Sequence, residues 1–436
     1  MAQYPALKED MYFATIQLPH TTVVKLRNTT TQKDFKSTSG AVALLELCTG
    51  TKSVTEIVNS LSELSGEPVE TVAQDVEKIL KILQEKGIIA MSTTPHKGAT
   101  AKKIKMKYPL ERAQIEITNL CNLSCLHCFN DSGKPHPNEL TTQEILSVID
   151  TLSSMGVDNI TLTGGEPLMH PDLFTIIEHA RKAPMSVTIF TNGTMITEEH
   201  VEQFKQLKVR GFDISIDSVD EKIHDRFRRQ RGALKKTMHA VQLLKEAGFH
   251  IKISVSLSQL NKNDIADMLE YFKEQDLKTF GFSPVTYSGR GIDGLAVSPE
   301  ECYPIWVEQL TYLKNEFPEA LSEIHERTEG ICGIAWNLIG IKSDGTILPC
   351  PGSNKVLGVG NVRDVNLKEF WDTNETLETL RRMNVKNDSI CNSCKYVKFC
   401  VGCIASAYFM EGELRCYYPY LCASRRAYDE VIGLPK

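Results

Sequence analysis

The chain has 436 residues, of which 42% are hydrophobic and 24% are charged, a composition typical of globular proteins with about three domains. No apolar run approaches the roughly 18–20 residues of a membrane span, and we find no signal peptide, so we expect a cytoplasmic protein without a membrane partner. The formal net charge of −6 provides no basic surface for nucleic acid, which is therefore not an expected partner.

The chain contains thirteen cysteines, more than a cytosolic enzyme needs for packing. Disulfides require an oxidising compartment, and nothing in the sequence directs export, so we interpret most of these cysteines as metal or cluster ligands. Cys48 and Cys302 stand apart from the rest, and we expect both to be small core residues. The other eleven form a group of three and a group of eight.

Residues 1–91 form the first expected domain. Short strands are predicted at Thr22–Arg27 and Lys33–Lys36, followed by helices that end in an amphipathic pair at Val58–Glu63 and Val69–Lys86. This order resembles the winged-helix RiPP recognition element, as in the peptide chaperone of pyrroloquinoline quinone assembly; RiPPs are ribosomally made, post-translationally modified peptides. The resemblance implies a ribosomal precursor peptide as partner, whose leader adds a strand to the exposed sheet edge.

A winged-helix domain that binds DNA is the alternative for this segment. The charge disfavours it, because residues 54–76 contain four Glu, one Asp and no Lys or Arg. Residues 92–108 are polar and basic, and we expect them to form a linker to the next domain.

Three cysteines, Cys121, Cys125 and Cys128, lie within eight residues. A cubane [4Fe–4S] cluster has four irons, so three cysteine ligands leave one iron open to a small chelating molecule. A structural zinc site uses four protein ligands, so zinc or incidental thiols are the weaker alternatives. A second motif, Gly164-Gly165-Glu166-Pro167, follows a β-rich run. Its glycines allow backbone carbonyls to approach a ligand closely, and its acidic residue suits an ammonium group.

The C-x3-C-x2-C spacing, the aromatic residue that follows it and the second motif together resemble the signature of the radical S-adenosylmethionine (SAM) enzymes. The resemblance implies that the three cysteines hold the catalytic cluster and that the second motif receives the amino group of SAM. It also implies reductive cleavage of SAM to methionine and a 5′-deoxyadenosyl radical, which takes a hydrogen from the substrate. A low-potential electron donor of the flavodoxin or ferredoxin type is then an expected partner.

The middle of the chain alternates six strand-like runs, from Ala113–Thr118 to Thr279–Pro284, with amphipathic helical stretches. This alternation predicts βα units and a parallel sheet in an α/β fold. The six repeats match the partial (β/α)6 barrel of the radical SAM family, expected over residues 109–310. Such barrels bind ligands at the C-terminal ends of their strands, where both motifs are expected to lie.

Further SAM contacts are expected at the same rim. Asn192 follows the third strand, and the polar Ser215 and Asp217 close the fourth strand, where they suit the ribose hydroxyls of SAM. Arg228 resembles the arginine that family members use to hold the SAM carboxylate, in the bidentate geometry that a guanidinium allows. Three more arginines lie within three residues of it, so the choice among them stays open, as does a solvated basic turn.

Residues 311–436 contain the other eight cysteines, in the pattern C-x12-G-x4-C followed by C-x2-C-x5-C-x2-C and two more. This pattern resembles the SPASM extension, which carries auxiliary clusters in radical SAM enzymes that act on peptides and proteins; its usual third gap is three residues, against two here. The resemblance implies one auxiliary cluster on Cys332, Cys350 and Cys403, a second on Cys391, Cys394, Cys400 and Cys422, and Cys416 either replacing Cys422 or completing the first. Two zinc ribbons are the alternative.

These features predict a radical SAM/SPASM enzyme with three [4Fe–4S] clusters that modifies a ribosomal precursor peptide. A thioether between a cysteine sulfur and a carbon is the expected product. Carbon–carbon cross-linking, epimerisation and oxidative decarboxylation stay open as peptide reactions. Maturation of a sulfatase or a tetrapyrrole is a further alternative, which leaves the N-terminal domain unexplained. A non-catalytic iron–sulfur or zinc scaffold is the alternative outside enzymes.

Overall fold

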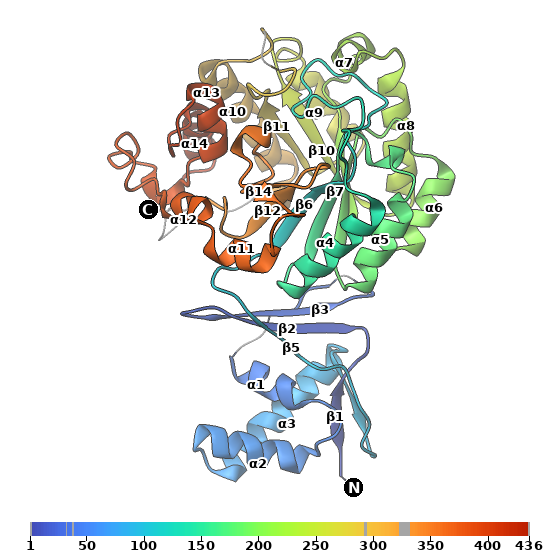
Figure 1. The fold of residues 1–436 in the computed structure, drawn as a ribbon, viewed down its shortest axis with the longest axis vertical. Helices are drawn as coiled ribbons and strands as arrows, with labels where there is room; N and C mark the ends of the chain where they lie inside the picture. The colour runs from blue at the N-terminus through green and yellow to red at the C-terminus, as the bar shows by residue number, and fades with distance from the viewer. Residues whose placement is uncertain (1, 32, 37–38, 292–293, 322–331, 435–436) are drawn as a thin grey trace. The chain divides into compact units, whose positions relative to one another are not determined.

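The computed structural model describes residues 2–31, 33–36, 39–291, 294–321 and 332–434 (Figure 1). The chain divides into two compact units, one of Met1–Pro109 with Ser154–Gly156 and one of Leu110–Ser153 with Val157–Lys436. Within the described ranges, no helix is both long and apolar enough to cross a membrane.

The N-terminal unit contains two small sheets. In the first sheet, β1 (Tyr4–Leu7) pairs antiparallel with β4 (Ile89–Ser92). The second has the order β3-β2-β5, with the bounds β2 (Met11–Gln17), β3 (Thr22–Asn28) and β5 (Lys102–Lys105). β3 runs antiparallel and β5 parallel to β2, so the segment expected to be a linker is folded onto this sheet over β5. The strand expected at 33–36 is reduced to a single bridge between Arg27 and Asp34.

Three helices pack against these sheets, α1 (Ser39–Leu47), α2 (Val54–Ser65) and α3 (Val69–Glu85). A capping box begins α2, in which the side chains of Ser53 and Glu56 each bond to the other's backbone. Such a cap contributes about 1 kcal/mol because it satisfies backbone N–H groups that have no partner inside the helix.

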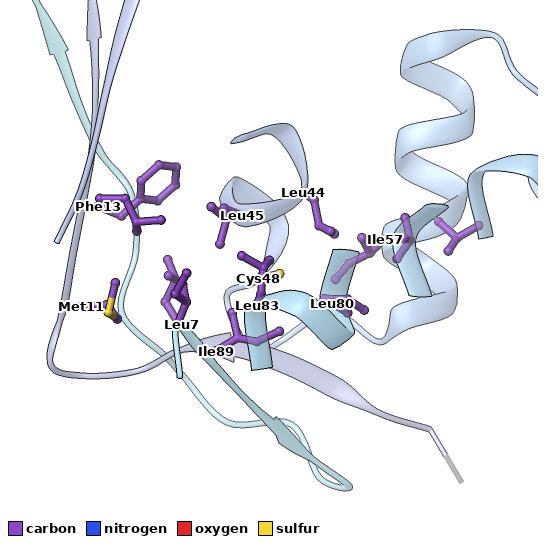
Figure 2. Close-up of a cluster of buried hydrophobic side chains, with 14 of the residues drawn as sticks. Leu7, Met11, Phe13, Leu44, Leu45, Cys48, Ile57, Leu80, Leu83 and Ile89 are labelled. Atoms are coloured by element: carbon purple, nitrogen blue, oxygen red, sulfur yellow. The ribbon is translucent and has the colours of Figure 1, made fainter. Parts of the chain in front are cut away.

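The core of this unit is a cluster of buried apolar side chains from β1, β2 and the three helices (Figure 2). Apolar residues recur at helical spacing in α3, where Val72, Val76, Leu80 and Leu83 are buried on one face. Each fully buried aliphatic side chain contributes about 2 kcal/mol. Cys48 is completely buried in this cluster, which confirms its expected role in the core.

The second unit is built on one sheet of nine strands in the order β11-β10-β9-β8-β7-β6-β12-β13-β14. The six strands expected for the partial barrel are present and parallel: β6 (Arg112–Glu116), β7 (Asn159–Thr163), β8 (Ser186–Thr191), β9 (Gly211–Ser215), β10 (His250–Leu257) and β11 (Phe280–Pro284). The helices between them are α4 (Thr142–Ser154), α5 (Leu173–Lys182), α6 (Glu198–Gln206), α7 (Glu221–Arg228), α8 (Ala233–Glu246) and α9 (Ile265–Glu274). Helices α4, α5, α6 and α8 lie along the outer face of the sheet (Figure 1).

The C-terminal cysteine-rich part continues the barrel sheet. Its first strand, β12 (Leu338–Ile341), pairs parallel with β6 and turns back through β13 (Thr346–Leu348) and β14 (Gly360–Asn361). The remaining helices are α10 (Pro299–Glu316), α11 (Leu367–Thr373), α12 (Glu375–Arg382), α13 (Ile404–Glu411) and α14 (Pro419–Val431). Cys302 is fully buried in α10, as expected for a core residue. The shared sheet fixes the cysteine-rich part against the first strand of the barrel.

Candidate active site

The three cysteines of the triplet lie on the loop that leaves β6, residues 117–134, which we call the cluster loop. Each of their sulfurs accepts a hydrogen bond. The pairs are Leu123 N–H with Cys121 Sγ at 3.4 Å, Ser132 N–H with Cys128 Sγ at 3.3 Å, and Arg228 Nη1 with Cys125 Sγ at 3.7 Å. Donors at all three sulfurs suit a ligand set that carries negative charge.

The electrostatic surroundings of these thiols fit cluster ligands. Burial raises the pKa of Cys121 to about 12, and it raises the pKa of Cys125 although Arg228 opposes the shift. Reactive free cysteines show the reverse, a lowered pKa, whereas a bound metal centre deprotonates a buried thiol outright. Within the described residues, no three Cys, His, Asp or Glu side chains converge as ligands of a single ion. A cubane spaces its thiolates more widely, because each binds a different iron.

A cavity of about 440 Å³ opens in front of the cluster loop at the C-terminal ends of the strands. This volume is in the range of small-molecule cofactor sites. The three cysteines line it together with five of the residues predicted to contact SAM, namely Gly164, Gly165, Asn192, Ser215 and Arg228. Glu166, Pro167 and Asp217 are buried behind its wall. The strands that follow add Ser256 and Ser283.

The two glycines of the second motif lie directly against the cluster loop. Gly165 N–H donates to Thr118 O at 2.8 Å. A Cβ on Gly164, whose φ is +155°, would lie 2.2 Å from Thr118 O, and one on Gly165 would lie 2.3 Å from Leu120 O. Any side chain at either position would therefore push the motif away from the loop. Glycine is required here for close backbone approach.

Glu166 has a different place from the one its charge suggested. Its side chain is fully buried, and its carboxylate accepts bonds from Thr191 Oγ1 at 2.8 Å, Asn192 N–H at 2.9 Å and Leu168 N–H at 3.2 Å. Burial raises the pKa of Glu166 to about 7 against the effect of these donors. The carboxylate ties the second motif to the end of β8, and its oxygens are already engaged.

Asp217 and Arg228 form a buried ion pair, with Oδ2 and Nη2 2.6 Å apart. Asp217 Oδ1 also accepts the Ser256 N–H at 3.1 Å, so this carboxylate faces the protein interior. Burial alone would raise the pKa of Asp217, but the neighbouring Arg228 holds it below its usual value. The Nε of Arg228 is buried and has no hydrogen-bond partner among the described residues.

His127, to which no role was assigned from the sequence, and Arg290 also belong to the site. His127 lies between two of the cysteines, lines the cavity and packs edge-on against Phe227 at 4.8 Å between ring centroids. Burial lowers its pKa to about 4, so the ring is neutral at pH 7. Arg290 Nε donates to Cys125 O at 2.8 Å, which holds the cluster loop from the side of β11. The position of the His127 ring between two of the cysteines was the feature of the sequence that could have indicated this role.

The eight C-terminal cysteines fall into two neighbourhoods. Burial raises the pKa of Cys350 to about 11, with contributions from the nearby Cys332 and Cys403 sulfurs. Cys416 belongs beside them, because its carbonyl accepts the Cys403 N–H at 3.2 Å. A Cβ on Gly402 would lie only 2.3 Å from that carbonyl oxygen. The Cys416 thiol also lies near the second neighbourhood, since Cys332 and Cys400 both add to the burial that raises its pKa.

The second neighbourhood gathers around Cys422. Burial raises its pKa to about 11, with further contributions from Cys400 and Cys394. Cys391 lies in the same group, since Cys422 adds to the burial that raises its pKa to about 12. Asp388 joins the two neighbourhoods: one oxygen accepts the Cys391 N–H at 3.1 Å and the other accepts the Cys416 N–H at 3.1 Å.

The cavity in front of the cluster loop extends to the first neighbourhood. Pro351 and Gly352, which follow Cys350, line it. Ser406 lines it as well, and its Oγ accepts a hydrogen bond from Cys403 Sγ at 3.1 Å. The three cysteines of the triplet thus line this cavity, and residues next to Cys350 and Cys403 line its other side.

Three segments of the chain match known protein families. Residues 115–272 match the radical SAM superfamily, residues 332–395 match the SPASM iron–sulfur cluster-binding domain, and residues 31–89 match coenzyme PQQ synthesis protein D, PqqD. Among its relatives, the AdoMet-dependent heme synthase of Methanosarcina barkeri is 30% identical over 331 residues, covering 70% of this chain and 94% of that protein. The antilisterial bacteriocin subtilosin biosynthesis protein AlbA of Bacillus subtilis is 26% identical over 400 residues, 89% of each chain.

A solved structure has a similar fold over nearly the whole chain. Streptococcus suis SuiB, crystallised with the precursor peptide SuiA, superposes with a TM-score of 0.66 at 16% identity, covering 95% of this chain and 98% of SuiB. The chain therefore belongs to the radical SAM superfamily, with a SPASM extension and a PqqD-like N-terminal domain. The predicted fold class is confirmed, and so is the expectation of an enzyme whose family binds SAM and iron–sulfur clusters.

Proposed function

We propose that this enzyme cleaves SAM at a cluster held by Cys121, Cys125 and Cys128 and uses the resulting radical to modify a ribosomal precursor peptide. The observation that carries the proposal is the cavity lined by the triplet, by the two glycines of the second motif and by Pro351, Gly352 and Ser406 beside the first C-terminal cysteine neighbourhood. When bound and reduced, the cluster and SAM supply a 5′-deoxyadenosyl radical that abstracts hydrogen from an unactivated carbon.

The protein's own groups then bind and orient SAM. We assign the backbone of Gly164 and Gly165 to its amino group, because both line the cavity beside the cluster loop. Arg228 is the donor for its carboxylate through the unpartnered Nε, and its charge is held in place by Asp217. Asn192 and Ser215 line the cavity where the ribose would lie. Glu166 and Pro167 support the motif from behind.

We propose two auxiliary [4Fe–4S] clusters, which with the first make three. The two neighbourhoods support one ligand set of Cys332, Cys350, Cys403 and Cys416 and a second of Cys391, Cys394, Cys400 and Cys422. Four cysteines in each set suit clusters that pass electrons rather than open a site to substrate. The electron donor is a low-potential protein of the flavodoxin or ferredoxin type.

The peptide substrate is supported by the N-terminal unit. PqqD-like domains in this family accompany peptide modification, and the relatives include a bacteriocin biosynthesis protein that aligns over 89% of this chain. A thioether between a cysteine sulfur and a carbon is the product we expect. Carbon–carbon cross-linking, epimerisation and decarboxylation remain the competing peptide reactions.

The leader is expected to bind as an added strand at β3. The sheet has two edge strands, and β5 carries three exposed lysines, which disfavour pairing with another chain. The outward backbone groups of Leu26 and Asn28 in β3 already bond to residues 33–35. Backbone groups alternate along a strand, so those of Val24 point to the same outer edge. This part of β3 is rich in β-branched residues, which suit an added strand.

Tetrapyrrole modification is the second candidate, because a heme synthase is 30% identical and 94% of its length is matched. About a third of this chain lies outside that match, and the peptide proposal accounts for it.

The test replaces Cys121, Cys125 and Cys128 together with Ala and measures 5′-deoxyadenosine after anaerobic reduction. We expect no product from the variant, because the open iron is lost, while the auxiliary iron stays bound. Wild-type enzyme is then incubated with the precursor encoded beside its gene and with iron–coproporphyrin. A peptide that loses two hydrogen atoms supports a cross-link; turnover of the porphyrin alone would decide for the second candidate.

A further inference from the structure

A buried network of charged and polar side chains joins the β12–β13 hairpin to the end of β6 and to the cluster loop. Lys342 follows β12, and its Nζ lies 2.8 Å from Glu116 Oε2 at the end of β6 and 2.9 Å from Asn130 Oδ1. Asn130 Nδ2 donates to Glu116 Oε1 at 2.8 Å, so the three side chains contact one another. Lys342 is 4% exposed and Glu116 is 5% exposed, while Asn130 lines the cavity.

A network of this kind adds little to stability. Removing two charges from water costs several kcal/mol per ion, and an ion pair offsets this only with good geometry and further hydrogen bonds. Well-packed apolar side chains between β6 and β12 would stabilise the sheet equally well. The position of the network, beside the third cysteine of the triplet, points to a role in the site.

Asn130 lies in the turn that follows Cys128. Ser132 N–H, at the far end of this turn, donates to Cys128 Sγ at 3.3 Å. Asp131 between them has a left-handed backbone with φ +51°, which a non-glycine residue adopts only when its surroundings hold it there. Arg290 holds the turn on one side through Asp131 Oδ1 at 2.7 Å and Ser132 O at 2.8 Å. Asn130 holds the other side.

We propose that Lys342 is a positioning residue that sets the reduction potential of the SAM-binding cluster. By fixing Asn130, Lys342 keeps the Ser132 N–H on Cys128 Sγ. Hydrogen bonds to cluster sulfurs and nearby positive charge both favour the reduced, more negative cluster. Lys342 lies in the turn between β12 and β13. The inference rests on the proposed SAM-binding cluster, and it does not depend on which substrate the enzyme modifies.

The test compares four variants of the full, reconstituted enzyme. Lys342→Met removes the charge, Glu116→Gln with Lys342→Met removes both charges together, and Lys342→Arg keeps the charge. Lys355→Met is the matched control, because Lys355 lies in the nearby connection between β13 and β14, its side chain is 67% exposed and it pairs with Asp344. The readout is the midpoint potential of the EPR signal that changes on addition of SAM, with thermal unfolding measured beside it.

We expect the first two variants to lower the midpoint potential of the SAM-binding cluster. The ratio of reduced to oxidised cluster at a fixed donor potential should then fall about tenfold, which corresponds to a shift of about 59 mV for one electron. Lys342→Arg and Lys355→Met should remain near wild type. The double variant leaves no unpaired buried charge, so it carries the test if Lys342→Met alone does not fold. A folded double variant with the wild-type potential would overturn the proposal.

A double-mutant cycle tests whether Lys342 acts through Asn130. Asn130→Ala should lower the potential, and adding it to the double variant should produce little further change, because both act on the same turn. Independent, additive effects would contradict the proposed route. If wild-type enzyme fails to modify the peptide while the variants still lower the potential, the substrate proposal fails and this one stands. If the variants leave the potential unchanged, this proposal fails whatever the substrate is.

Discussion

Gly164 and Gly165 are the residues that allow the second motif to reach the cluster loop. The carbonyls of residues 118–120 occupy the space that a Cβ at either glycine would need. Glu166 then fixes the motif through two donors at the end of β8 and a third from Leu168 N–H. The four-residue motif thus has two separate parts. The glycines bring its backbone close to the cluster loop, and the buried Glu166 carboxylate holds the motif in the fold.

Replacing Gly165 with Ala is expected to weaken SAM binding about tenfold, because overpacking of this kind costs 1–3 kcal/mol. SAM affinity by calorimetry and uncoupled 5′-deoxyadenosine formation are the measurements. Gly133→Ala is the matched control, since Gly133 lies on the cluster loop that Gly165 contacts and an added Cβ there meets no atom within 4 Å. Wild-type affinity in the Gly165 variant would show that the motif does not need this close approach.

Strand β3 is the element on which recognition of the peptide is proposed to depend. Strand addition draws its affinity from main-chain hydrogen bonds, so it needs an edge with backbone groups that point outward. The central strand β2 is paired on both sides, and the lysines of β5 protect the other edge. Only part of β3 is available, because its C-terminal half is bonded to residues 33–35.

Val24→Pro is expected to reduce precursor affinity two- to tenfold, since it removes one outward N–H and a hydrogen bond contributes about 0.5–1.5 kcal/mol. Proline is tolerated on an edge strand when its nitrogen faces away from the sheet, so the fold should persist. Val24→Ala is the control, because it shortens the side chain but keeps the N–H. Fluorescence anisotropy with labelled leader measures both; equal binding by the two variants would exclude pairing at this position.

The chain as a whole combines a PqqD-like unit with a radical SAM unit in which barrel and cysteine-rich part share a sheet. The parallel pairing of β12 with β6 joins the two parts, and residues next to Cys350 and Cys403 line the same cavity as the triplet. The N-terminal unit has its own core and includes β5, so it ends near Pro109 rather than at the expected residue 91.

Iron analysis of anaerobically reconstituted enzyme is expected to show about twelve irons, because eleven grouped cysteines can hold three cubanes. The triple Cys→Ala variant of the triplet should retain about eight, since the other ligand sets are separate. Cys416→Ser should lower the content of the first auxiliary site, whereas Cys302→Ser, a buried core position, should leave iron unchanged. Stoichiometric zinc would refute the auxiliary clusters.

An enzyme that begins at Leu110 should cleave SAM without peptide at close to the wild-type rate and bind the precursor weakly. The cavity residues all lie in the second unit, while the proposed leader strand and its sheet are removed together. A cut at residue 89 would leave β5 without its partner strand. Chromatography of 5′-deoxyadenosine and mass spectrometry of the peptide check both halves; full precursor modification would disprove the role of the N-terminal unit.

The amino-acid sequence by itself determined the class of fold, and it predicts the three cysteines of the triplet as cluster ligands. Cysteine spacing is a local property, because a short loop must place its three sulfurs on one cluster whatever surrounds it. Six alternating strand and helix patterns were enough for the barrel, since apolar periodicity reports which face of each element is buried. The same reasoning placed Cys48 and Cys302 in the core.

Tertiary structure decided the roles that depend on partners distant in the chain. Glu166 and Asp217 look like ligand-binding acids in sequence, but Thr191 and Arg228 engage them in the folded protein. The link between Lys342 and Glu116 spans 226 residues and exists only because β12 pairs with β6. Local patterns report burial and spacing, whereas hydrogen bonds and ion pairs across the fold depend on which elements become neighbours.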